Sequence, residues 1–126
     1  DSAAPVGKLI AWVPWNRVEA ENLAREGRLV FVDVTADWCF TCKVNERVVL
    51  NSAAVTAAFT GGATVALKAD WTNPSQEIAD YLASFGRYGI PFYAVYRPGA
   101  APHPLPEILT QSIVLEAIGG TQDGGR

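Results

Sequence analysis

The strongest apolar segment of the chain is residues 29–36, with the sequence Leu-Val-Phe-Val-Asp-Val-Thr-Ala. It is rich in β-branched residues and shows no alternation of apolar and polar positions. A strand with one face in water alternates in this way, whereas a strand buried on both faces does not. The segment is therefore predicted to be the central strand of a sheet.

Shorter apolar runs predict four more strands, at residues 8–13, 63–69, 92–96 and 107–110. The first suits a sheet edge because Pro14, directly after it, limits its pairing. In the run at residues 63–69, Val65 and Leu67 are expected on one face, since side chains alternate along a strand. Pro91 comes at the start of the strand at residues 92–96, where its missing N–H does least harm.

Capping residues and apolar residues at helical spacing predict helices at residues 16–25, 39–50, 52–59, 75–85 and 112–118. Asn16 is a predicted N-cap, and Asn51 or Ser52 is another. Gly27 ends the first helix. The apolar positions expected to pack are Val18, Leu23 and Ala24 in the first helix, Val44 and Val48 in the second, and Ile78, Leu82 and Phe85 in the fourth.

With the further helical turn at residues 52–59 counted with the helix before it, the order of elements is β-α-β-α-β-α-β-β-α. Crossovers make part of the sheet parallel, and a final hairpin makes part of it antiparallel. This order predicts an α/β fold with a mixed central sheet flanked by helices, over residues 8–118. Residues 1–7 are predicted to be a flexible lead-in, and the Gly-rich residues 119–126 a disordered tail.

Length and charge narrow the possible partners. The chain of 126 residues fits one domain, and its 13 acidic against 10 basic side chains, without a basic run, argue against nucleic acid. No stretch approaches the ~20 continuous apolar residues of a membrane span, and the N-terminus lacks a signal-peptide pattern. We expect a soluble monomer that does not itself insert into a membrane and that is processed or cut from a larger protein.

The only two cysteines, Cys39 and Cys42, are three positions apart, directly after the predicted central strand. At the start of a helix such a pair can close into a disulfide, and the free N–H groups there stabilise a thiolate. Cys39 is therefore the expected nucleophile. Cys42, about one turn further along, would be less exposed and would resolve a mixed disulfide by attacking Cys39.

Three other interpretations of the pair remain open. A zinc site needs four ligands, and the chain offers only His103 besides the two cysteines, so no metal is expected. A purely structural disulfide over so short a loop would remove little entropy from the unfolded chain. Two unrelated core cysteines would have no reason to fall at a strand-to-helix turn. The redox-active pair itself is the expected reactive group, with no other cofactor.

Two carboxylates are candidates for the site, Asp33 for proton transfer or for tuning the cysteine pKa values, and Glu46 for tuning them. Asp33 lies in the middle of the central strand, where burial raises the pKa of a carboxyl that has no compensating partner. Glu46 is four residues after Cys42, on the same helical face. A structural role for Asp33, or an ordinary solvated charge for Glu46, is the alternative in each case. A carboxylate at Glu46 is expected to raise the cysteine pKa values, because a nearby negative charge disfavours the thiolate.

A strand carrying Asp33, then Trp38-Cys39-x-x-Cys42-Lys43, then Ile90-Pro91 before another strand resembles the thioredoxin superfamily over nearly the whole chain. The resemblance implies a thioredoxin-like fold. It also implies that Pro91 is cis and lies against the disulfide, where it forms a backbone edge for substrate. Trp38, Phe40, Ile90 and Pro91 are then the candidate substrate-binding residues. An apolar rim of Trp38, Phe40 and Tyr88 is equally explained by packing.

A closer resemblance is to the C-terminal periplasmic domain of the DsbD and ScsB thiol:disulfide interchange proteins. It is carried by Ala36-Asp37-Trp38-Cys39-x-x-Cys42-Lys43 with Glu46, by residues 65–72 and by Gly89-Ile90-Pro91. The family implies a soluble periplasmic domain of a bacterial inner-membrane protein. Such a domain takes electrons from a transmembrane cysteine-pair domain and passes them to an N-terminal periplasmic domain. In that family the acids that match Asp33 and Glu46 hold the nucleophile's pKa high.

The sequence departs from thioredoxin proper in two places. Phe40-Thr41 replaces Gly-Pro between the cysteines, a position linked with redox potential and partner choice. Leu67 is expected at the place of thioredoxin's lysine, because Lys68 has the opposite strand parity. An Asp–Lys relay is therefore not expected, and Glu46 is the better second group.

The sequence leaves three functions open. The first is a protein-disulfide reductase that relays electrons, with a reducing potential. The second is a disulfide oxidase or isomerase of the same fold, which would need a strongly depressed Cys39 pKa and a destabilised disulfide. The third is a binding module with a structural disulfide.

Overall fold

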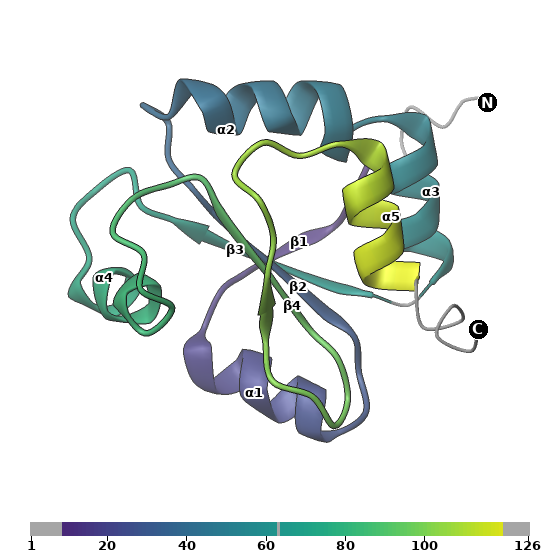
Figure 1. Cartoon of the computed structure of the whole chain (residues 1–126), viewed down its shortest axis with the longest axis horizontal. Helices are drawn as coiled ribbons and strands as arrows, with labels where there is room; N and C mark the ends of the chain where they lie inside the picture. The colour runs from purple at the N-terminus through teal and green to yellow at the C-terminus, as the bar shows by residue number, and fades with distance from the viewer. Residues whose placement is uncertain (1–8, 63, 120–126) are drawn as a thin grey trace.

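The computed structural model describes residues 9–62 and 64–119 (Figure 1). Its strands are β1 (Trp12–Pro14), β2 (Val30–Thr35), β3 (Val65–Asp70), β4 (Phe92–Tyr96) and β5 (His103–Pro104). Its helices are α1 (Arg17–Arg25), α2 (Phe40–Asn45) with the π-helical turn η2 (Glu46–Leu50), α3 (Ala53–Gly61), α4 (Gln76–Ala83) and α5 (Gln111–Gly119). The predicted order of strands and helices is confirmed. The predicted lead-in lies outside the described residues, as does the predicted tail at residues 119–126 except for Gly119, which is the last residue of α5.

The five strands form one mixed sheet in the order β1-β3-β2-β4-β5. β3 is parallel to both β1 and β2, whereas β4 is antiparallel to β2 and β5 is antiparallel to β4. All six residues of β2 are buried. The unalternating segment at residues 29–36 is therefore the central strand that its pattern predicts, and β1 lies at an edge as expected.

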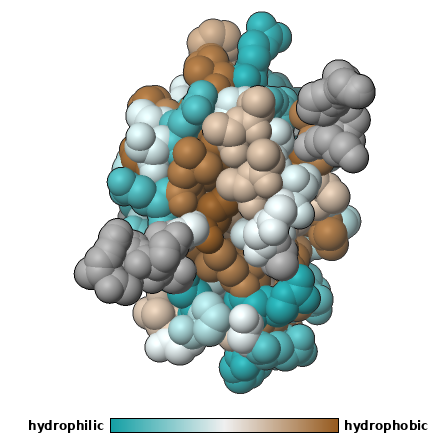
Figure 2. All heavy atoms as spheres, turned by 90° about the vertical axis from the view of Figure 1, so that its right-hand side faces the viewer, coloured by the Kyte–Doolittle hydropathy of each residue, from teal (hydrophilic) through white to brown (hydrophobic). Residues whose placement is uncertain are grey.

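Helices cover both faces of the sheet. α2, α3 and α5 lie on one face, and α1 and α4 lie on the other (Figure 1). The first face holds a core of aromatic and aliphatic side chains around Phe31, Phe59 and Tyr93. The second holds a core around Val32, Tyr81 and Phe92. Figure 2 shows the side of the molecule that carries α3 and α5, where an apolar band lies between hydrophilic residues.

Local hydrogen bonds set where the helices begin. The side chains of Asn16, Ser52 and Ser75 each accept a hydrogen bond from the backbone N–H three residues later. Such bonds satisfy N–H groups that the first turn of a helix leaves free. Asn16 and Ser52 are thus confirmed as N-caps. Gly27, with φ of +92°, ends the first helix in a left-handed conformation that suits glycine.

Three predicted packing residues are instead exposed. Val18 is 62% exposed because α1 faces the sheet through Ala20, Leu23 and Ala24, and a residue two positions before Ala20 points the other way. Val44 and Val48 are 41% and 59% exposed. The inner side of α2 and η2 carries other residues, which are Cys42, Asn45, Val49 and Leu50.

The prediction of a last strand at residues 107–110 is wrong. The final hairpin is formed by β4 with β5, and Val95 is paired with His103. The backbone at residues 107–109 is bound by a side chain instead of a strand. The Asn45 Nδ2 donates to the Glu107 carbonyl at 2.8 Å, and the Leu109 N–H donates to Asn45 Oδ1 at 3.2 Å. These bonds satisfy backbone groups that a strand would have paired in the sheet.

Candidate active site

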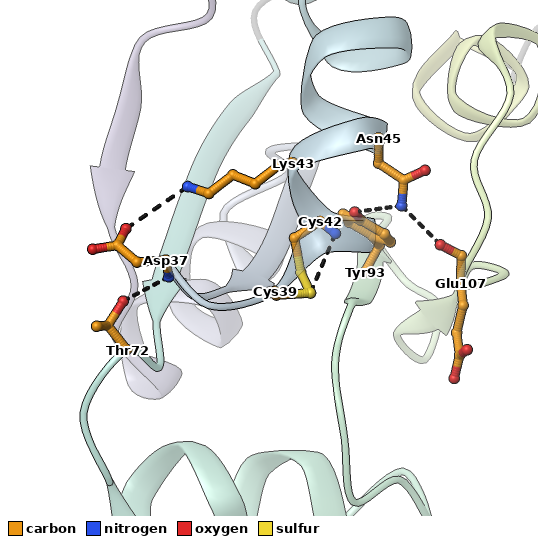
Figure 3. Close-up of a disulfide and its surroundings, with 8 residues drawn as sticks. All are labelled: Asp37, Cys39, Cys42, Lys43, Asn45, Thr72, Tyr93 and Glu107. Carbon is orange, nitrogen blue, oxygen red and sulfur yellow. Dashed lines mark hydrogen bonds and ion pairs between the residues drawn. A yellow bond between two sulfur atoms is a disulfide. The ribbon is translucent and has the colours of Figure 1, made fainter.

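Cys39 and Cys42 form a disulfide at the junction between β2 and α2 (Figure 3). Cys39 is the N-cap of α2, and its Sγ accepts a hydrogen bond of 3.2 Å from the Cys42 N–H. Cys39 is 6% exposed and Cys42 is 3% exposed. The pair therefore lies just below the surface at the start of a helix, where a backbone N–H is positioned to stabilise a Cys39 thiolate.

The loop before β4 packs against this disulfide. Ala36, Cys39 and Cys42 form a small apolar cluster, and Ile90 and Trp71 pack against it. Pro91 is buried and the Ile90–Pro91 peptide bond is cis, as the resemblance implies. Trp71 was not predicted to belong to the site, because its place in a turn gives no sign of a contact with residues about 30 positions earlier.

Exposed aromatic side chains surround the disulfide. Trp38 is 62% exposed, Phe40 79% and Tyr88 81%. Trp38, Trp71, Tyr88 and Ile90 line one open groove of about 700 Å³. Phe40 does not line that groove. It lines a separate hollow on the outer face of α2 and η2, so the residues predicted to form one docking rim lie on two surfaces.

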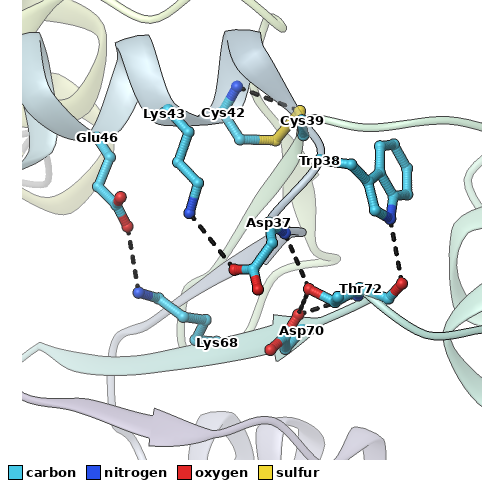
Figure 4. Close-up of polar contacts among 9 residues, drawn as sticks. All are labelled: Asp37, Trp38, Cys39, Cys42, Lys43, Glu46, Lys68, Asp70 and Thr72. Atoms are coloured by element: carbon cyan, nitrogen blue, oxygen red, sulfur yellow. Dashed lines mark hydrogen bonds and ion pairs between the residues drawn. A yellow bond between two sulfur atoms is a disulfide. The ribbon is translucent and has the colours of Figure 1, made fainter.

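The turn after β3 holds the Asp37-Trp38 segment in place (Figure 4). The Asp37 N–H donates to Thr72 Oγ1 at 2.8 Å, and the Trp38 Nε1–H donates to the Thr72 carbonyl at 3.2 Å. The Thr72 hydroxyl donates in turn to Asp70 Oδ1 at 2.6 Å. Hydrogen bonds from Thr72 lower the pKa of Asp70. This network fixes the residue before Cys39 from a segment more than 30 positions away.

Asp33 is buried on the sheet face that α2 covers, and only 2% of it is exposed. Its Oδ1 has no hydrogen-bond partner within the described part of the chain. Burial raises the pKa of Asp33 to about 7, although the nearby Lys68 ammonium acts in the opposite direction. The Glu46 carboxylate adds to the rise. The carboxyl thus titrates near neutral pH, which agrees with the direction expected from its place in the sequence.

Lys68 corrects one prediction. The parallel pairing of β2 and β3 aligns Asp33 with Lys68, so both side chains leave the sheet on the same face. Leu67 belongs to the core on the opposite face. The expectation that Leu67, and not Lys68, shares a face with Asp33 was wrong, because it depended on a strand register that the sequence does not fix. Lys68 Nζ lies 3.3 Å from Glu46 Oε2 (Figure 4). Because Lys68 is also aligned with Asp33 in the sheet, Asp33, Lys68 and Glu46 form one cluster of charges.

Asn45 and Tyr93 also belong to this region and were not predicted. Asn45 is buried one turn after Cys42, and its Nδ2 donates to Tyr93 Oη at 2.8 Å (Figure 3). Tyr93 is paired with Asp33 across β2 and β4, and burial raises its pKa. One sign of this role was present in the sequence: Asn45 is a polar residue three positions after Cys42, on the side of the helix that is expected to be buried.

Within residues 9–62 and 64–119, no three His, Cys, Asp or Glu side chains come together as a possible metal site. None of the helices in these ranges is long and apolar enough to cross a membrane.

A mixed sheet between two helical layers, with a disulfide of the Cys-x-x-Cys type at the start of a helix, defines a thioredoxin-fold domain of the disulfide-oxidoreductase type. Residues 11–98 match the family model described as thioredoxin-like. The chain therefore belongs to the thioredoxin-like family. No curated protein sequence matches it significantly.

Several solved structures share the fold. The oxidised C-terminal domain of DsbD from Neisseria meningitidis is 22% identical, with a TM-score of 0.62 over 86% of this chain and 94% of that one. Its reduced form is 25% identical, with a TM-score of 0.61 over 77% and 84% of the two chains. A thioredoxin from Thermus thermophilus is 22% identical, with a TM-score of 0.65 over 94% and 90%. DsbD domains and ordinary thioredoxins are thus similar to the chain to the same degree.

Proposed function

We propose that this domain is a protein-disulfide reductase that relays two electrons between partner proteins through Cys39 and Cys42. The observation that carries the proposal is the position of the disulfide at the start of a helix, on the sheet face that also holds the buried Asp33. A disulfide with only a structural role would have no need of a titratable carboxyl in the core behind it.

The reaction has two exchange steps. The Cys39 thiolate attacks one sulfur of a partner disulfide, so that a mixed disulfide forms and the partner's other sulfur leaves as a thiolate and takes up a proton. The Cys42 thiolate then attacks the Cys39 sulfur, which closes the Cys39–Cys42 disulfide and releases the second partner thiol. The partner is reduced by two electrons and the domain is oxidised by two electrons.

The resolving step needs a base, because Cys42 is buried and must lose its proton before it attacks. Asp33, with a pKa of about 7, is the group suited to take that proton. Glu46 has a positioning role, since its carboxylate binds Lys68, the cation nearest to Asp33 in the register of the sheet. Ile90, which packs against the disulfide, and the cis Pro91 that follows it supply the edge on which the partner chain lies.

The partners we propose are a transmembrane domain that delivers electrons through its own cysteine pair and an N-terminal periplasmic domain that receives them. The domain would then work in the bacterial periplasm as part of an inner-membrane protein. Support comes from the motif around Cys39 with Glu46, and from the likeness to both redox forms of the DsbD C-terminal domain.

Replacement of the resolving cysteine tests the proposal. Cys42→Ala leaves Cys39 able to form the mixed disulfide and unable to release it, so an adduct with a disulfide-containing protein should accumulate on a non-reducing gel. Cys39→Ala is the matched control and should trap nothing. If neither variant forms an adduct while the wild-type disulfide stays intact, the domain is a binding module with a structural disulfide.

One contact favours an oxidase or isomerase as the second candidate. The Cys42 N–H that donates to the Cys39 sulfur stabilises the thiolate form of Cys39, and a strongly stabilised thiolate makes a disulfide more oxidising. The reductase is preferred because Asp33 and Glu46 put two carboxyl groups near the cysteine-bearing helix, and negative charge opposes thiolate formation.

A further inference from the structure

The outer face of α2 and η2 carries an exposed apolar stripe. Phe40, Val44 and Val48 are four residues apart and are 79%, 41% and 59% exposed. They line a shared hollow of about 200 Å³ together with Lys43 and Arg47. These five residues are called the α2 stripe below. Exposed apolar side chains that gather in one hollow, with charged residues at its rim, favour a contact site.

The charge of the α2 stripe is opposite to that of the chain. The chain has a formal net charge of −3, yet residues 40–50 hold two cations and a single acid, Glu46. That acid is bound to Lys68. Lys43 Nζ lies 3.7 Å from Asp37 Oδ1, but the two side chains are 48% and 80% exposed, so the pair is weak. The charge offered to a partner along the α2 stripe is therefore positive.

The α2 stripe is separate from the groove lined by Trp38, Trp71, Tyr88 and Ile90, since no residue lines both. Trp38 directly precedes Cys39 and belongs to the groove, while Phe40 directly follows Cys39 and belongs to the α2 stripe. A partner joined to Cys39 by a mixed disulfide must place its neighbouring residues over one or both of these surfaces. A relay domain docks two different partners, and two surfaces beside the nucleophile allow it to distinguish them.

Resting on the function proposed above, we infer that the α2 stripe docks one of the two redox partners, through a segment next to the partner's reacting cysteine that carries a large apolar side chain and carboxylates. The apolar side chain fills the hollow, and the carboxylates face Lys43 and Arg47. A protein segment fits better than a membrane surface, because the stripe is short and concave, whereas helices that lie on membranes present a large apolar face. The pairing of opposite charges speeds encounter and selects the partner.

Two synthetic peptides test this inference. Each has one cysteine in a mixed disulfide with glutathione and a leucine beside it; one peptide adds two glutamates and the other adds two lysines. The rate constant for reduction of each by the reduced chain is measured at low ionic strength. The wild-type chain should reduce the acidic peptide about fivefold faster or more, since oppositely charged surfaces raise association rates. Arg47→Glu should abolish or reverse that preference.

The double variant Val44→Ser/Val48→Ser should slow reduction of the acidic peptide about tenfold, because the apolar anchor loses its site. Oxidised glutathione, too small to reach the α2 stripe, should be reduced at the wild-type rate. Val18→Ser, at a 62% exposed valine on the opposite layer, is the matched control and should change neither rate.

Equal rates for the two peptides, unchanged in the double variant, would overturn the docking inference and leave the reductase intact, provided that oxidised glutathione is still reduced. Failure to reduce both the peptides and oxidised glutathione would overturn the reductase itself. Binding of the chain to phosphatidylglycerol vesicles that Val44→Ser/Val48→Ser abolishes, without any preference between the peptides, would assign the stripe to a membrane surface and contradict a protein partner.

Discussion

Asp33 on β2 and Lys68 on β3 are paired across the parallel sheet, and both side chains leave it on the face that also carries Tyr93. Lys68 also binds Glu46 on η2 at 3.3 Å. A buried acid, a cation and a second acid thus form one electrostatic cluster behind the disulfide. The Lys68 charge lowers the pKa of Asp33, and the Glu46 charge raises it.

These opposing effects predict opposite outcomes for two substitutions. Lys68→Met should raise the pKa of Asp33 above its value of about 7, because the stabilising cation is lost. Glu46→Gln should lower the pKa of Asp33, because a like charge is removed. A carbon-13 NMR titration of the Asp33 carboxyl measures both. If the pKa of Asp33 shifted in the same direction in both variants, loss of the Lys68–Glu46 ion pair, and not the individual charges, would control that pKa.

The raised pKa of Asp33 also predicts how stability depends on pH. The folded chain holds the Asp33 proton up to about pH 7, whereas the unfolded chain releases it near the ordinary value of 3.8. Between these values the folded state binds more protons, so the free energy of unfolding falls as pH rises. Asp33→Asn removes this dependence and should stabilise the fold at pH 8 by up to about 4 kcal/mol, with little effect near pH 4.

Urea denaturation of wild type and Asp33→Asn at the two pH values measures this difference. Asp37→Asn is the control, since that aspartate is exposed and should show no such gain. An Asp33→Asn variant that is less stable than wild type at pH 8 would contradict burial of an uncompensated carboxyl.

Asn45 should contribute strongly to stability. Asn45→Ala leaves the buried Tyr93 hydroxyl, the Glu107 carbonyl and the Leu109 N–H without their partner. Buried polar groups left unsatisfied cost about 1–3 kcal/mol each, so a total loss of about 3 kcal/mol is expected after local relaxation. Urea denaturation at constant pH measures it. Asn73→Ala, in an exposed turn, should change stability by less than about 0.5 kcal/mol. A comparable loss in both variants would contradict a specific role for Asn45.

The two cysteines should differ in reactivity. Cys39 lies at the start of α2 with the Cys42 N–H near its sulfur, whereas Cys42 is on the buried side of the helix. Iodoacetamide should therefore alkylate Cys39 in Cys42→Ser at least about tenfold faster than Cys42 in Cys39→Ser. In denaturant the two rates should converge. Faster alkylation of Cys42 in the folded chain would exchange the roles of nucleophile and resolving cysteine.

Features fixed by neighbouring residues could be predicted from the sequence. The central strand follows from an unbroken apolar run, and Asn16 and Ser52 are caps because each bonds a backbone N–H three residues away. The disulfide needs only two cysteines at a strand-to-helix turn. The burial of Asp33 follows from the strand in which it lies.

Features that depend on the register and packing of distant segments could not be predicted from the sequence. The parity of Lys68 relative to Asp33 is set by how β3 aligns with β2, and a shift of one residue reverses it. Trp71 reaches the disulfide, and Asn45 binds residues 107–109, only through the folded chain. Apolar spacing also misplaced Val44 and Val48, because a helical stripe does not reveal whether it faces the core or a partner.

The reduction potential of the Cys39–Cys42 couple tests the proposed reductase most directly. The chain is equilibrated with defined ratios of reduced and oxidised glutathione, and the fraction of free thiol is measured after acid quenching. A potential of about −200 mV or lower is expected, in the range of reducing thioredoxin-like couples. A potential near about −120 mV, the range of a strong disulfide oxidant, would contradict the reductase and favour the oxidase.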